Sequence, residues 1–154
     1  MRSTRRLTLL CALAVIALAA LATGASAATQ PATGAFVEGH EQLLDQRQVG
    51  DDWWYTIKRN VKFTGTYAGQ ADFTELVIIE PDGTTHLYGS MAFSGKACGS
   101  KTQLTFVIVG DGNQATTIEG TYTVTGASGT TLGKGSFTGT SGTAGAYTGS
   151  ADCG

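Results

Sequence analysis

The chain has 154 residues, with 12 acidic and 10 basic side chains and a formal net charge of −2. This length favours one domain with a single core. After its first six residues the chain has no basic run longer than Lys58-Arg59. Binding to nucleic acids or to anionic membranes requires a basic face, so the composition argues against both.

Residues 1–27 have the pattern of a secretory signal peptide. The basic start MRSTRR is followed by the apolar run LTLLCALAVIALAALA and then by the small residues Ala25-Ser26-Ala27. The apolar run is too short for a membrane anchor. We therefore predict cleavage between Ala27 and Ala28. The product is expected to be a secreted, extracellular protein that does not associate with a membrane.

Nearly every later segment alternates apolar and polar residues, which is typical of strands with one buried face. We expect a flexible N-terminus at 28–33 and a barrel domain at 34–154. A helix is conceivable only at Glu38–Gln48. Gly39 within this segment and Gly50 just after it disfavour even that helix. The predicted strands are 34–41, 53–65, 70–80, 84–95, 101–109, 115–125, 131–139 and 144–152.

Turn chemistry predicts how these strands pair. In Pro81-Asp82-Gly83 the proline presets its φ angle and the glycine accepts a left-handed conformation. A hairpin there places Glu75 opposite Gly89 and Phe73 opposite Met91. Two further turns, at 67–69 and 110–113, predict that Phe63 lies opposite Phe73 and that Phe106 lies opposite Ile118.

In each predicted hairpin, either the odd-numbered or the even-numbered residues of both strands share one apolar face. We refer to this odd or even numbering as parity. The strand at 115–125 separates the two faces clearly, with Ile118 and Tyr122 on one side and threonines on the other. Consecutive hairpins joined by short turns, with one apolar face to bury, favour a closed barrel over a sandwich. The sequence thus predicts an all-β fold, a single up-and-down antiparallel barrel of eight strands.

Cys98 and Cys153 remain after the predicted cleavage. An even number of cysteines in an oxidising compartment favours a disulfide, and two unpaired thiols are the alternative. Bonded cysteines have Cα atoms within about 7 Å of each other. In a meander the last strand lies across the barrel from Cys98, so the bond requires the C-terminal tail to cross and partly cap that mouth.

An eight-stranded barrel has an interior just wide enough to be filled by side chains or to hold one small ligand. The inward-facing candidates for lining such a ligand cavity are Tyr55, Phe73, Val77, Leu87, Met91, Phe106, Ile118 and Tyr122. These residues are equally consistent with an ordinary packed core.

Arg59 and Glu75 are the candidates for catalysis. Both fall on the apolar face, where the register makes them diagonal neighbours, and Gly89 leaves space beside the carboxylate. A buried pair of this kind can orient a polar group of a ligand or act in a reaction. The alternative, which we favour, is an ion pair that only supports the architecture.

The aromatic run Trp53-Trp54-Tyr55 lies at one mouth of the predicted barrel. Trp53 and Tyr55 face inward, where they plug the mouth or floor a pocket. Trp54 points outward and is the better candidate for contact with a partner.

We expect no metal and no cofactor. His86 is predicted on the outer face and His40 in an acidic stretch, and neither has a second ligand at metal-binding spacing. Asp111-Gly112-Asn113 begins like a calcium loop but lacks the later ligands, so it is interpreted as a hairpin turn. The oligomeric state is left open.

The segments ELVIIEPDGTTHLYGSMAFSG and EGTYTVTGASGTTLGKGSF resemble a secreted bacterial family of unknown function with an allene oxide cyclase-like, calycin- or dirigent-type barrel. The likeness extends from about Thr33 to Tyr147. It implies a barrel with a small apolar cavity. The family often has Glu-Arg near the position of Met91-Ala92 and Gln-His at that of Val109-Gly110, so no catalytic residue carries over.

These observations favour a secreted, non-catalytic barrel that binds a small apolar molecule in its lumen. One alternative is a cyclase or isomerase that confines an apolar substrate, with Arg59 and Glu75 as its polar groups. A second alternative is an extracellular interaction protein that uses the threonine-rich outer faces. The volume of the lumen separates these hypotheses, because a filled interior leaves only the surface.

Overall fold

Alternating apolar and polar residues form eight antiparallel strands in the computed structural model, which describes residues 28–113 and 115–154. The predicted signal peptide lies outside the described residues. The strands are β1 (Thr29–Val49), β2 (Asp52–Gly65), β3 (Tyr67–Ile79), β4 (Thr84–Ala97), β5 (Ser100–Asn113), β6 (Ile118–Thr125), β7 (Thr131–Thr140) and β8 (Ala144–Asp152). In this part of the chain no helix is long and apolar enough to cross a membrane.

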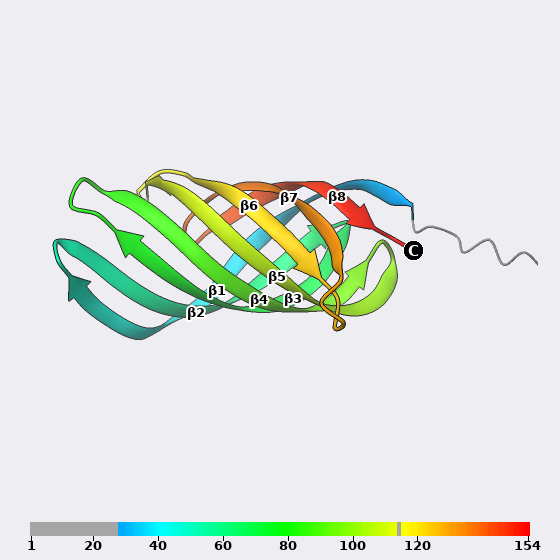
Figure 1. Ribbon diagram of the computed structural model, residues 1–154, viewed down its shortest axis with the longest axis horizontal. Helices are drawn as coiled ribbons and strands as arrows, with labels where there is room; N and C mark the ends of the chain where they lie inside the picture. The colour runs from blue at the N-terminus through cyan, green and yellow to red at the C-terminus, as the bar shows by residue number, and fades with distance from the viewer. Residues whose placement is uncertain (1–27, 114) are drawn as a thin grey trace, which may run out of the picture.

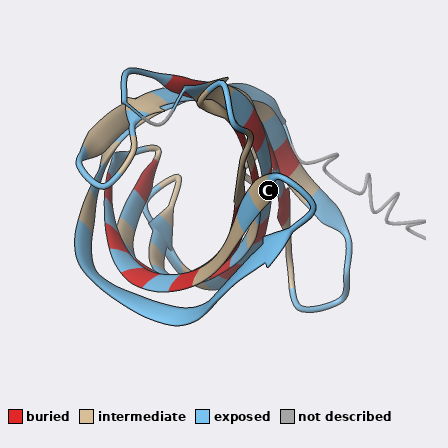
Figure 2. Cartoon of the chain, turned by 90° about the vertical axis from the view of Figure 1, so that its left-hand side faces the viewer, coloured by how far each residue is buried: buried red, intermediate tan, exposed pale blue. Residues whose placement is uncertain are grey.

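Each strand pairs with the next, and β1 also pairs with β8, so the sheet closes into an up-and-down barrel (Figure 1). This confirms the predicted all-β fold and its strand order. Figure 2 looks into the barrel along its length and shows buried positions alternating with exposed ones on the strands.

β1 differs most from the prediction. Its first part, Thr29–Val37, pairs with β8 and buries Ala32 completely, so all but Ala28 of the predicted flexible N-terminus at 28–33 is part of the barrel. The segment Glu38–Gln48, the candidate helix, continues as strand and pairs with β2. The backbone hydrogen bonds that β2 offers along this whole length outweigh a weak helical pattern.

The predicted register of β3 with β4 is confirmed, with Glu75 opposite Gly89 and Phe73 opposite Met91. The two other predicted registers are wrong. Phe63 pairs with Gly69, and Phe106 pairs with Val124, because the β2–β3 turn is tighter than predicted and β5 runs on to Asn113. Both slips span an even number of residues, so the same side chains still face inward.

Aromatic rings fill the barrel. Phe63 stacks on Phe106 with ring centroids 5.5 Å apart, and Tyr67 meets the same Phe106 ring edge-on at 5.0 Å. β7 and β8 leave room for these rings by placing glycine inward; a Cβ at Gly135 would lie 2.7 Å from the Tyr122 ring. Phe73, Met91, Phe106 and Ile118 converge in this one core, as parity predicts.

At one end of the barrel the predicted disulfide joins Cys98 and Cys153, whose Cα atoms are 5.8 Å apart. Nearby, the Tyr147 hydroxyl donates to the carbonyl of Thr64 at 2.9 Å and accepts from the Tyr67 amide at 3.0 Å. We call this the disulfide end. A disulfide is typical of proteins in oxidising, extracellular environments.

The opposite end, which we call the open end, carries the β1–β2, β3–β4, β5–β6 and β7–β8 turns. β8 begins only at Ala144 and pairs with β1 no further than Val37. The β1–β2 and β3–β4 hairpins therefore project beyond the closed part of the barrel, at the left in Figure 1.

Candidate functional site

A cluster of four charged side chains marks the boundary between the packed core and the open end. Arg59 on β2 forms ion pairs through Nη1 with Glu38, and through Nη2 with Glu75 and, at 3.2 Å, with Glu41. The Arg59 and Glu75 side chains are 3% and 1% exposed. The predicted pair is thus present and buried, and two further carboxylates join it. We refer to these four residues as the ionic cluster.

A bulge in β1 explains why Glu38 and Glu41 escaped the sequence analysis. Residues three apart on a regular strand face opposite sides of the sheet. An extra residue between these two glutamates lets Glu38 pair with Val61 and Glu41 with Arg59, so both side chains face inward. The only sequence signal was a glycine between two glutamates in a segment assigned no inward face.

The ionic cluster has one guanidinium for three carboxylates, and Glu75 is its most deeply buried carboxylate. Burial, together with the nearby carboxylates of Glu38 and Glu41, raises the pKa of Glu75 to about 7, although Arg59 acts in the opposite direction. Glu38 also accepts a hydrogen bond from the Gly142 amide at 2.7 Å. The cluster therefore ties β1, β2, β3 and the β7–β8 turn together.

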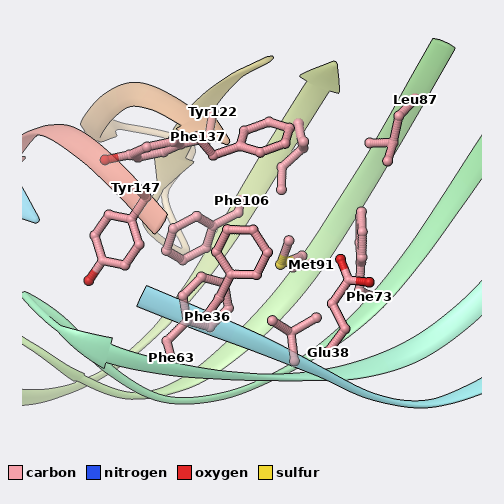
Figure 3. Close-up of a pocket in the computed structure, with 12 residues that line it drawn as sticks. Phe36, Glu38, Phe63, Phe73, Leu87, Met91, Phe106, Tyr122, Phe137 and Tyr147 are labelled. Atoms are coloured by element: carbon pink, nitrogen blue, oxygen red, sulfur yellow. The ribbon is translucent and has the colours of Figure 1, made fainter. Parts of the chain in front are cut away.

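Below the ionic cluster the lumen is almost filled. A cavity of about 40 Å³ remains, and Glu38 is the charged residue in its lining. Figure 3 shows the rings of Phe36, Phe63 and Phe106 gathered around it. This volume holds about one to three water molecules, whereas sites for organic ligands measure about 300–1,000 Å³.

The predicted lining residues are divided by the structure. Those that line the cavity are Phe73, Leu87, Met91, Phe106 and Tyr122, and those outside its lining are Tyr55, Val77 and Ile118. The space expected beside Glu75 is also absent, because the ring of Phe73 occupies it. A Cβ at Gly89 would lie 2.2 Å from that ring.

Beyond the ionic cluster the inner face becomes apolar again. Ile57 and Val77 are buried there although they lie outside the core cluster. Further out, Trp53 and Leu43 are 40% and 51% exposed. The residues of this open-end apolar face are Leu43, Trp53, Tyr55, Ile57, Val77 and Ile79.

The aromatic run at this end does not plug the barrel. Trp53 and Tyr55 stack on each other, with ring centroids 6.3 Å apart, and Trp53 remains open to solvent. Trp54, expected to be the exposed ring, is partly covered because the guanidinium of its neighbour Arg47 lies 5.6 Å above it. The better contact residue is thus Trp53.

On the outer face His86 bridges two carboxylates, Asp111 at 2.6 Å and Glu80 at 3.0 Å. The hydrogen bond with Asp111, followed by that with Glu80, raises the pKa of His86. Solvent-exposed pairs of this kind contribute little stability. No group of three or more histidine, cysteine, aspartate or glutamate side chains within residues 28–113 and 115–154 is arranged to hold a metal ion.

A scan of the chain against protein-family models finds no match, and a search of curated proteins finds none either. The function is therefore inferred from geometry and sequence pattern.

Proposed function

We propose that this is an exported, non-catalytic binding protein that holds an apolar group of its partner against the open-end apolar face. The exposure of Trp53 and Leu43, beside the buried Ile57 and Val77, carries this proposal. Large apolar side chains that remain exposed next to a buried apolar surface are typical of binding sites. The signal-peptide pattern and the disulfide support export.

Binding inside the lumen has less support. In the cavity below the ionic cluster a ligand needs several times the present volume of about 40 Å³. Enlarging the cavity requires the stacked rings of Phe63 and Phe106 to separate, which removes part of the core.

A cyclase or isomerase that folds its substrate within the lumen meets the same obstacle. Arg59 and Glu75 are buried against each other and Glu38, which fits a structural role. The resemblance to allene oxide cyclase-like barrels supports the fold, while Met91-Ala92 and Val109-Gly110 lack the polar pairs of that family. Binding through the open end requires neither a larger lumen nor those groups.

The uncharged fluorophore N-phenyl-1-naphthylamine, whose emission rises in apolar surroundings, tests where binding occurs. The double variant Trp53→Ser/Leu43→Ser should weaken its binding roughly tenfold or more, since two large apolar contacts are lost. The matched control Tyr88→Ser/Val109→Ser, which removes two similarly exposed residues of the outer face, should bind as the wild type does.

Met91→Ala separates the lumen from the open end, because it enlarges the cavity and leaves the open-end apolar face unchanged. We expect unaltered binding of the fluorophore. Stronger binding to Met91→Ala, together with normal binding to the open-end variant, would place the site in the lumen and overturn the proposal.

A further inference from the structure

The part of β1 that projects at the open end has a free backbone edge. β1 pairs with β8 only as far as Val37, and the Glu38 amide makes a last bond to the carbonyl of Thr143 at 2.9 Å. From Gly39 to Val49 the strand pairs with β2 on one side and with no described strand on the other. This edge is longer than a typical strand of about 5–6 residues, so it offers enough backbone for one more strand.

The charges at this end restrict what can pair there. Of the twelve acidic residues in the chain, ten lie in the half of the barrel nearer the open end. They are Glu38, Glu41, Asp45, Asp51, Asp52, Glu75, Glu80, Asp82, Asp111 and Glu119. Four of the seven basic residues outside the predicted signal peptide lie nearer the disulfide end: Lys62, Lys96, Lys101 and Lys134.

This uneven distribution favours a basic partner. An acidic end repels a second copy of the same end and an anionic membrane, and it attracts a cationic chain. The three basic residues left there are outnumbered by the ten acidic ones: Arg59 is buried among three carboxylates, Lys58 is exposed, and exposed Arg47 lies 3.9 Å from Asp45.

The side chains along the free edge add an apolar element. Leu43 and Leu44 are both half-exposed, at a bulge between Leu43 and Asp45. Acidic residues flank them, Glu41 on one side and Asp45 on the other. Bulges and charges on an edge prevent indiscriminate strand pairing, so a pairing segment has to match this pattern.

We infer that the partner presents an extended segment of basic and apolar residues, which adds as a strand to the β1 edge between Gly39 and Val49. Its backbone pairs with β1. On the inner face its basic side chains lie beside Glu41 and its apolar ones beside Leu43, and on the outer face its basic side chains lie beside Asp45. This inference rests on the proposed function and names the chemistry of the partner.

Three short acetylated peptides test it: one of lysine and valine, the same peptide with every backbone nitrogen methylated, and one of glutamate and valine. The lysine peptide should bind and slow hydrogen exchange of amides between Gly39 and Val49. N-methylation keeps the charge but blocks strand pairing, so it should weaken binding about tenfold or more. The glutamate peptide should not bind.

A matched pair of variants tests the contribution of charge. Asp51→Asn at the open end should weaken binding of the lysine peptide about two- to fivefold. Asp72→Asn, which makes the same change in net charge nearer the disulfide end, should leave the affinity unaltered.

Equal binding of the methylated and unmethylated peptides, or protection confined to amides outside Gly39–Val49, would overturn strand addition. So would a failure of the lysine peptide to bind. If N-phenyl-1-naphthylamine still depends on Trp53 and Leu43 in that case, the proposed function stands and only the identity of the partner falls.

Discussion

Replacing Glu75 with glutamine should remove most of the pH dependence of stability near neutrality. The Glu75 side chain is 1% exposed, and burial raises its pKa from the ordinary 4.5 to about 7. The folded protein therefore binds this proton more tightly than the unfolded chain does. The resulting stability is fully present below pH 4.5 and is lost as the pH rises through about 7, a decrease of about 3 kcal/mol.

Urea unfolding followed by tryptophan fluorescence, at several values between about pH 4.5 and about pH 8, measures this dependence. Glu75→Gln should give a nearly flat profile and match or exceed the wild type at the upper end. Glu119→Gln, which removes an exposed carboxylate on the outer face, should retain the wild-type decrease. A wild-type slope in Glu75→Gln would refute the role assigned to this carboxyl group.

Arg59→Met removes the cation on which the ionic cluster depends. Glu75 is then left beside Glu38 and Glu41, and losing one partner of a buried ion pair costs about 3–5 kcal/mol. The loss should be smaller at about pH 5, where Glu75 takes up a proton. An equal loss across the whole pH range would show that Arg59 acts through packing alone.

Three other changes test how the barrel is held together. Replacing Cys98 and Cys153 with serine should lower the free energy of unfolding by about 4 kcal/mol, given their separation of 55 residues; a loss in urea unfolding below about 1 kcal/mol would contradict this. Tyr147→Phe leaves the Tyr67 amide without its acceptor and should cost about 1–3 kcal/mol in the same assay, whereas unchanged stability would mean that water replaces the hydroxyl. Gly89→Ala brings a methyl group against an aromatic ring and should lower the urea midpoint, with a cost of about 1–3 kcal/mol; a neutral result would show that the ring moves freely.

The inward and outward faces could be predicted because side chains alternate along a strand. The registers at Phe63 and Phe106 were wrong, yet both residues are core members, since an even slip preserves parity. Parity also predicted that Arg59 and Glu75 lie together. Parity alone could not predict the disulfide, because Cys153, which follows β8, has to reach across the end of the barrel to Cys98.

The open end was predicted poorly because its structure depends on bulges and on where neighbouring strands stop. A bulge turns Glu38 and Glu41 to the same face, and alternation cannot anticipate it. Trp53 is exposed because β8 does not extend as far toward the open end as β1 does. This depends on two segments that are far apart in sequence. Local pattern could not reveal that the inner face continues beyond the closed barrel.

Methyl chemical-shift mapping with N-phenyl-1-naphthylamine tests most directly whether binding occurs at the open end. Ile57, Val77 and Ile79 report on the open-end apolar face, and Ile108 reports on the lumen cavity. The predicted result is chemical-shift changes confined to the methyl groups of Ile57, Val77 and Ile79. Shifts centred on Ile108, with the open-end methyl groups unchanged, would contradict a binding surface at the mouth of a filled barrel.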